Sequence, residues 1–206
     1  MTSVTPNSSV IAAGERGEGR GRERERVVEK DHLPRLAPEW YRGFAFVHWT
    51  LTVEGRATGW LDESFNARWQ VVQLHACARY QLAALAYVLM PDNIHLLWAG
   101  VAEESDQRLG IAFLRKQLSP ALAPAIWQRQ PYDHVLRDEE RKPDAVAAAA
   151  HYLLQNPVRA GLVAISGEYP FLGCCVAGYP DLDVRQVDYW ERFWKIYNRQ
   201  VNTTKT

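Results

Sequence analysis

Two apolar runs of strand length that share one short turn constrain the fold of this chain more than any other feature. Residues 82–90 and residues 94–101 are each apolar enough and long enough to form one strand, and Pro91-Asp92 lies between them. Strands joined by so short a turn pair in antiparallel orientation. The sequence therefore predicts an antiparallel β-hairpin near the middle of the chain.

A strand and a helix are predicted before this hairpin. Residues 43–53 are rich in β-branched and aromatic side chains, a composition that is typical of strands. Asp62 or Ser64 can cap a helix over about residues 65–79. The apolar residues that predict this helix recur at helical spacing and are Phe65, Trp69, Val72 and Ala76.

A second helix is predicted after the hairpin, and a strand follows it. Ser105 or Asp106 can cap the helix, and Ser119-Pro120 is expected to end it, because proline lacks the amide that an α-helix needs. Residues 132–136 then indicate a short strand. The inner side of the helix is expected to consist of Leu109, Phe113 or Leu114, and Leu118.

An Ala-rich helix over about residues 144–155 comes next, and Asn156-Pro157 is expected to stop it. The order β-α-β-β-α-β predicts an α+β fold: a ferredoxin-like, or RRM-like, antiparallel sheet with helices on one face and the Ala-rich helix as an addition. A C-terminal helix is expected to pack on the domain, because large apolar residues recur there at helical spacing: Tyr189, Trp190, Phe193, Trp194, Ile196 and Tyr197.

Three segments are expected along the chain: a tail over residues 1–38, a folded domain over residues 39–165, and an extension over residues 166–206. The tail consists largely of Ser, Thr, Pro and Gly followed by alternating Gly, Glu and Arg, so it cannot bury enough apolar surface to offset its ordering entropy. Disorder is the expected state. The alternative is an arginine-rich arm that contacts phosphates, which the interleaved glutamates weaken.

Composition excludes some classes of protein and leaves nucleic-acid binding open. Lys plus Arg and Asp plus Glu number 24 each, which gives no global signal for nucleic acid, although binding needs only a local basic face. No apolar run reaches the ~18 residues that span a bilayer, and no signal peptide is recognisable, so a cytoplasmic protein without membrane contact is expected. The spacing of the three cysteines suggests neither a zinc site nor a disulfide framework, and buried free thiols are expected: Cys77, Cys174 and Cys175.

Asn93 and His95 form the first pair of candidate functional residues. Alternate residues of a strand share a face, so both side chains point one way while Ile94 and Leu96 point the other. An imidazole nitrogen and an amide oxygen on one face can ligate one ion. The alternative is a half-exposed part of the sheet without a ligand role.

Tyr152 and Asn156 form the second pair, because residues four apart share one face of a helix. A phenol is a poor nucleophile at its ordinary pKa of ~10, but a cation on the attacked phosphate makes it useful. Asn156 could add an oxygen ligand to such a cation. The alternatives are a packing role for Tyr152 and an N-cap role for Asn156 before Pro157.

Two segments of the chain resemble motifs of one protein family. Residues 87–98, YVLMPDNIHLLW, are similar to the Met-Pro-(Asn/Asp)-His-U-His-U-U segment of HUH single-tyrosine transposases, where U is apolar. Residues 152–163, YLLQNPVRAGLV, resemble the tyrosine-helix segment of the branch called REP-associated tyrosine transposases. Residues 132–137 and the tail from Gly178 to Tyr197 also look like that branch, so the resemblance covers about residues 40–198.

The resemblance implies an activity, a cofactor and a role for each motif residue. Family members cut one DNA strand through a tyrosine, which keeps the 5′ phosphate and leaves a free 3′ hydroxyl. Tyr152 matches this nucleophile, His95 the second histidine of the metal-binding pair, and Asn156 the ligand from the tyrosine helix. The implied cofactor is Mg²⁺ or Mn²⁺, with no small-molecule cofactor. The implied partner is single-stranded or hairpin DNA, bound by a monomer or homodimer.

Asn93 departs from the family pattern, since it stands where the first histidine belongs. An amide oxygen suits Mg²⁺ but would hold a transition metal less firmly than imidazole. Three hypotheses follow: a DNA-nicking transposase, a domesticated relative that binds DNA with weakened or no activity, and an RNA-binding domain, against which the lack of an RNP-type aromatic pattern argues. The candidates for contact with DNA, each otherwise a solvated charge, are Arg115, Lys116, Arg137 and Arg159.

Overall fold

The computed structural model describes residues 36–204 of the 206-residue chain. The expected disorder of residues 1–38 therefore concerns residues that lie almost entirely outside the described part. Within the described part, no helix is both long enough and apolar enough to cross a membrane.

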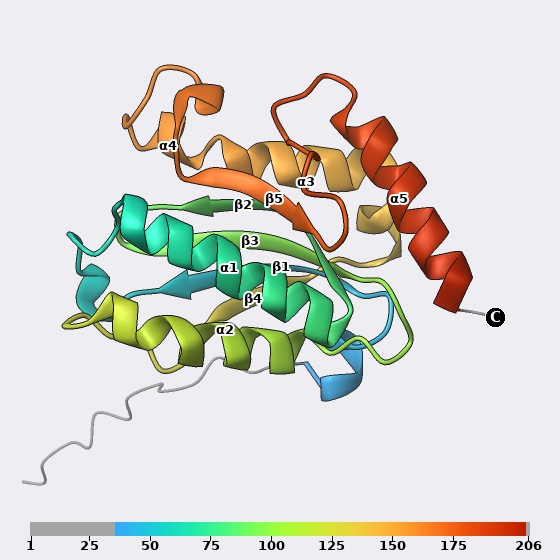
Figure 1. The fold of residues 1–206 in the computed structure, drawn as a ribbon, viewed down its shortest axis with the longest axis horizontal. Coiled ribbons are helices and arrows are strands. Elements are labelled where there is room, and N and C mark those ends of the chain that lie inside the picture. Colours follow the sequence, from blue (N-terminus) through green and yellow to red (C-terminus); the bar gives the residue numbers. More distant parts are fainter. Residues whose placement is uncertain (1–35, 205–206) are drawn as a thin grey trace, which may run out of the picture. The chain divides into compact units, whose positions relative to one another are not determined.

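Five antiparallel strands form one sheet in the order β4-β1-β3-β2-β5 (Figure 1). The predicted hairpin is confirmed, because β2 and β3 pair in antiparallel register and the Met90 amide donates to the Asn93 carbonyl across the turn at 2.7 Å. The strands are β1 (Phe46–Thr52), β2 (Leu82–Leu89), β3 (Asn93–Gly100), β4 (Tyr132–Val135) and β5 (Leu172–Val176).

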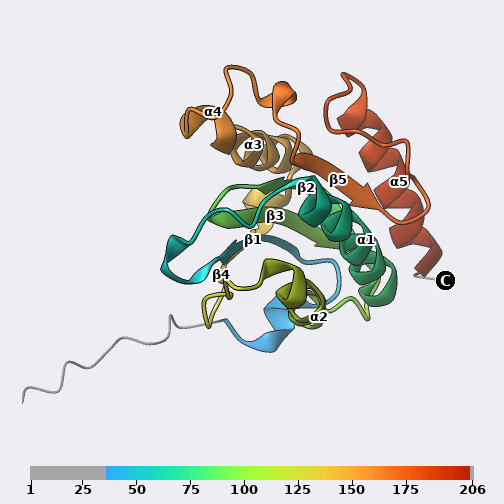
Figure 2. The same cartoon turned by 60° about the vertical axis from the view of Figure 1, so that its left-hand side comes forward.

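Helices cover both faces of this sheet. The first two helices lie on one face, and α3 and α5 lie on the other, as Figures 1 and 2 show. The helices are α1 (Glu63–Tyr80), α2 (Gln107–Leu122), α3 (Pro143–Leu154), α4 (Asn156–Arg159) and α5 (Tyr189–Thr204). Four short 3₁₀ helices connect these elements: η1 (Pro38–Tyr41), η2 (Glu54–Arg56), η3 (Asp138–Arg141) and η4 (Ser166–Glu168). The fold class is α+β, as predicted.

The sheet separates two hydrophobic cores because its side chains alternate between faces. One core lies between the sheet and α1 and α2, and contains Trp49, Trp69 and Trp98. The other lies between the sheet and α3 and α5, and includes Phe193, which is fully buried. The predicted C-terminal helix is confirmed as α5, and the Tyr197 hydroxyl anchors it by donating to the Gly100 carbonyl at 3.1 Å.

The predicted helix starts are confirmed, whereas one predicted end is wrong. Asp62 accepts a hydrogen bond from the Phe65 amide at 2.7 Å, and Asp106 caps α2 in the same way. Helix α2 does not end at Pro120 but continues to Leu122, whose side chain is fully buried. Burial of the Leu122 side chain outweighs the lost amide bond.

Two further expectations need correction. Leu109 is 54% exposed and does not belong to the inner side of α2, which Ile111, Leu114 and Leu118 form instead. The fifth strand, β5, has no counterpart among the predicted strands. This strand is short and contains Cys174 and Cys175, which are only half-buried, whereas Cys77 is buried as expected.

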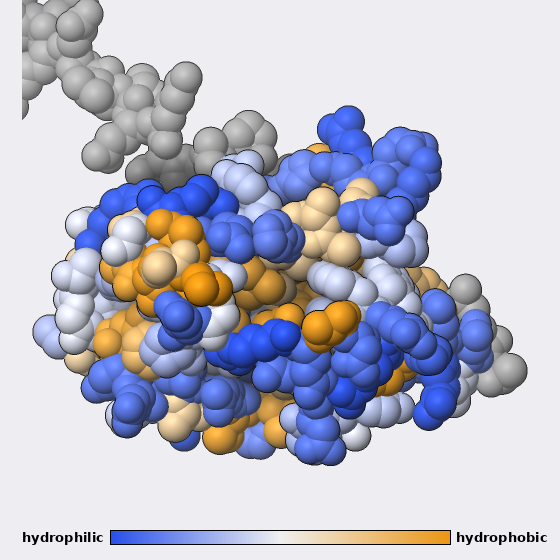
Figure 3. Space-filling model, turned by 90° about the horizontal axis from the view of Figure 1, so that it is seen from above, coloured by the Kyte–Doolittle hydropathy of each residue, from blue (hydrophilic) through white to orange (hydrophobic). Residues whose placement is uncertain are grey.

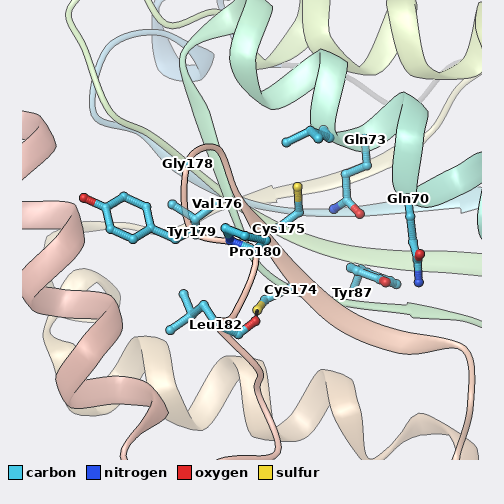
Figure 4. Close-up of a pocket in the computed structure, with 11 residues that line it drawn as sticks. Gln70, Gln73, Tyr87, Cys174, Cys175, Val176, Gly178, Tyr179, Pro180 and Leu182 are labelled. Carbon is cyan, nitrogen blue, oxygen red and sulfur yellow. Dashed lines mark hydrogen bonds between the residues drawn. The ribbon is translucent and has the colours of Figure 1, made fainter.

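A cavity of about 450 Å³ lies between α1 and the edge of the sheet at β5. Figure 4 shows Gln70 and Gln73 reaching from α1 toward Tyr87 and Cys175 at this cavity. Gln73 is fully buried, and neither atom of its amide has a hydrogen-bond partner among the described residues. This amide is therefore expected to destabilise the fold.

Replacement of Gln73 by methionine should stabilise the protein by about 1–2 kcal/mol, because it removes a buried unpaired amide while keeping the volume. The matched control is Gln107→Met on α2. Gln107 is equally buried, but its amide accepts from Trp49 Nε1 at 3.0 Å and donates to the Ala45 carbonyl at 2.7 Å. That variant should lose about 2 kcal/mol. Urea unfolding of both variants measures the two changes in the free energy of unfolding. A destabilised Gln73→Met would contradict the claim that the Gln73 amide is unpaired.

Candidate functional site

Asn93 and His95 lie at the start of β3 and face the side of the sheet that carries α3. They are paired with Thr52 and Thr50 of β1, while Ile94 on the opposite face is fully buried in the α1–α2 core. Asn93 is itself buried, and its Oδ1 has no hydrogen-bond partner within residues 36–204. The predicted register is therefore confirmed: the amide oxygen and the imidazole point to one side.

The imidazole of His95 is held by β1. Its Nδ1 lies 3.1 Å from Thr50 Oγ1, which leaves Nε2 as the nitrogen able to meet a ligand. Burial lowers the pKa of His95 to about 4, with further lowering by Arg159 and Arg56 against an opposing effect of Asp92. His95 is thus a neutral imidazole at pH 7.

His48 is a neighbour that the sequence interpretation missed. It lies on β1 with its ring centroid 5.5 Å from that of His95, and its buried Nε2 has no hydrogen-bond partner among the described residues. Burial, with repulsion from His95 and His134, lowers its pKa to about 4. Strand alternation over residues 46–52 was the available signal, because it places the polar residues His48, Thr50 and Thr52 on this face.

Tyr152, Asn156 and Arg159 meet where α3 passes into α4. The Tyr152 side chain is 63% exposed. One guanidinium nitrogen of Arg159 donates to the Tyr152 carbonyl at 2.8 Å, and the other donates to Asn156 Oδ1 at 2.7 Å. The guanidinium carbon lies 4.0 Å from the centroid of the Tyr152 ring, a cation–π distance.

The three predicted metal ligands do not fit a three-ligand site as the chain arranges them. Asn93 and His95 each keep one atom that could ligate an ion, but the oxygen of Asn156 already accepts a hydrogen bond from Arg159. An ion on that oxygen would stand within about 5 Å of the guanidinium and be repelled by it. No cluster of three His, Cys, Asp or Glu side chains suited to a metal occurs in the described part of the chain.

The predicted basic residues are not brought together. Arg115 and Lys116 lie on α2, on the sheet face opposite α3, and Arg115 donates to the backbone carbonyls of Gln128 and Arg129. Arg137 follows β4 near the strand end that pairs with the start of β1. Of the four predicted basic residues, Arg159 is the one in contact with Tyr152.

Exposed polar and apolar side chains lie on β4 and on the segment that follows α4. Tyr132 of β4, opposite Thr50, is 54% exposed, and His134 bonds Glu140 at 2.8 Å. Leu162 and Ile165, which follow α4, are also exposed. Figure 3, which looks onto the side of α3, shows an apolar patch at the end of the molecule where this segment lies.

The chain is similar to a curated protein in sequence and to a solved structure in fold. No protein-family profile matches the chain. A Haemophilus influenzae protein, provisionally named a REP-associated tyrosine transposase, is 24% identical over 137 residues, which cover 59% of this chain and 75% of the relative. The solved structure is titled as a REP-associated tyrosine transposase bound to a REP hairpin.

The likeness to that structure has a TM-score of 0.57 at 20% identity and covers 68% of this chain and 81% of the other, so it shows a shared fold. The curated relative and the two motifs around His95 and Tyr152 agree with it. The resemblance of the chain to the REP-associated branch of the HUH single-tyrosine transposases is thus supported by a curated relative in sequence and by a solved structure in fold.

Proposed function

We propose that this protein binds single-stranded or hairpin DNA and cuts one strand with the hydroxyl of Tyr152. The observation that carries the proposal is the exposed Tyr152 ring beside the Arg159 guanidinium, at 4.0 Å. Nucleophile and cation thus lie together at an open surface. The hairpin bound to the solved relative supports DNA as the substrate.

The proposed reaction is a transesterification. The Tyr152 oxygen forms a bond to phosphorus and loses its proton to water, and the bond from phosphorus to the 3′ oxygen breaks. That oxygen takes a proton and leaves as a 3′ hydroxyl, while the 5′ phosphate stays on Tyr152. Attack of a 3′ hydroxyl on the phosphotyrosine reverses the step and rejoins a strand, without a change in oxidation state.

A divalent ion, Mg²⁺ or Mn²⁺, is the cofactor that the family resemblance implies. In this chain it would meet the Asn93 oxygen and the His95 Nε2, both neutral, while the third oxygen is bound to Arg159. Since the donor set does not fit, no step of the proposed reaction depends on an ion.

Asn93→His is expected to create a metal site where the natural chain has a poor one. The new imidazole would stand beside His95 on the same face of β3, and Mn²⁺ affinity should rise by about 10-fold or more. Calorimetric titration of the two proteins measures the change. His95→Ala in the Asn93→His background is the control and should remove the gain. An unchanged affinity would show that the two side chains do not converge.

A DNA-binding protein without cleavage is the second candidate function, and Asn93 in place of histidine is the observation that favours it. Incubation with hairpin DNA, followed by a denaturing gel, distinguishes the two candidates. A covalent protein–DNA adduct supports cleavage. Retention of hairpin binding without an adduct, with and without Mn²⁺, supports the second function.

A further inference from the structure

Arg159 gives the end of α3 a positive charge that belongs to the chain itself. Its guanidinium binds the Tyr152 carbonyl, stacks on the Tyr152 ring and holds the oxygen of Asn156. One side chain therefore contacts the candidate nucleophile and occupies the atom that an ion would need.

The backbone fixes this position. The chain passes from α3 to α4 through Gln155, whose amide bonds the His151 carbonyl at 3.0 Å, and whose carbonyl accepts from the Arg159 amide at 3.0 Å. Gly161, with a φ of +70°, then ends α4 in a left-handed conformation that glycine adopts easily. The turn directs Arg159 back over Tyr152, so the contact is part of the fold of this segment.

The guanidinium keeps donors for a ligand. Of its five N–H groups, two are used in the bonds to Tyr152 and Asn156, and the side chain is exposed. Arg159 forms no ion pair within residues 36–204, whereas Arg56, the other arginine near His95, is paired with Asp92. Arg159 is thus available to an anion that approaches Tyr152.

We propose that the Arg159 guanidinium, in place of a divalent ion, is the cation that binds the phosphate at Tyr152. The proposal deepens the proposed function and rests on it for the identity of the phosphate, which is the scissile phosphodiester of single-stranded DNA. Arginine suits this role because its planar fork donates to two phosphate oxygens at once and stays charged at every relevant pH. Such donors also stabilise the charge that develops when the tyrosine attacks.

Salt dependence of binding tests the contact without cleavage. A fluorescein-labelled single-stranded oligonucleotide carrying a hairpin is titrated by anisotropy at several salt concentrations in EDTA. The plot of log K against log salt concentration has a negative slope, and Arg159→Gln should make it less steep by about 0.7, the value for one lost phosphate contact on a single strand. Arg159→Lys should retain the slope, and Arg68→Gln, which removes an exposed arginine of α1 on the opposite sheet face, should leave it unchanged. An unchanged slope for Arg159→Gln overturns the proposal.

Adduct formation tests the replacement of the metal. The natural protein should form the covalent adduct at the same rate in EDTA and in MnCl₂. Arg159→Ala should be slower by about 100-fold, and added guanidinium ion should restore part of the rate, which it would not do for a merely structural residue. Loss of the natural protein's adduct in EDTA, with recovery in MnCl₂, overturns the proposal.

The two proposals fail in different ways. If the natural protein forms no adduct in either solution, cleavage by Tyr152 fails, and the salt slope of Arg159→Gln alone decides whether Arg159 binds phosphate. If an adduct forms only with Mn²⁺, cleavage stands and the role of Arg159 as the replacing cation fails.

Discussion

Tyr152→Phe should lower the rate of covalent protein–DNA adduct formation by at least about a thousandfold while leaving hairpin binding intact. The substitution removes a hydroxyl from an exposed ring and keeps the stacking of Arg159 on that ring. The free energy of unfolding should therefore change by less than about 0.5 kcal/mol. A denaturing gel after incubation with labelled hairpin DNA measures the adduct, and anisotropy measures binding.

Tyr132→Phe is the matched control for this experiment. Tyr132 is also exposed and lies on β4, paired with Thr50 on the sheet face that carries His95. This variant should form the adduct at the natural rate. An adduct that persists in Tyr152→Phe and disappears in Tyr132→Phe would show that Tyr132 of β4 is the nucleophile and that the assignment of Tyr152 is wrong.

The secondary structure near the hairpin could be predicted because its signals are local. Asp62 and Asp106 cap the helices that they were expected to cap, and strand alternation places Asn93 and His95 on one face. The continuation of α2 past Pro120 and the presence of β5 could not be predicted from local signals. The continuation of α2 depends on burial of Leu122 against residues far along the chain, and β5 exists because β2 offers it an open edge.

The sequence supplied candidates for the site but not their arrangement. Spacing placed Tyr152 and Asn156 on one helical face, and Arg159 was expected to contact DNA. The hydrogen bond from Arg159 to Asn156 was not predicted, because it depends on the turn between α3 and α4. His48 was missed since its partner, His95, lies 47 positions away on another strand.

The protein should lose a large part of its stability between pH 7 and pH 4 through His48 and His95. Both are half-buried, and desolvation is the main cause that lowers the pKa of each from 6.5 to about 4. For His48 the added causes are His95 and His134, and for His95 they are Arg159 and Arg56, opposed by Asp92. Protonation of either ring in the folded chain at pH 4 thus costs about 3 kcal/mol relative to the unfolded chain.

The sign of the effect follows from proton uptake. Between pH 6.5 and pH 4 the unfolded chain binds protons on these histidines and the folded chain does not, so acid favours unfolding. The stability that the two neutral rings contribute is fully present above pH 6.5 and falls by about 3–6 kcal/mol in total by pH 4, a large part of a typical domain's stability. Urea unfolding at a series of pH values measures this loss. His48→Asn should make the slope in this window shallower, whereas His75→Asn, at an exposed position of α1, should leave it unchanged. A stability that stays constant from pH 6.5 to pH 4 would show that the two imidazoles take up protons in the folded chain without cost, and that the site between β1, β3 and α3 is open to water.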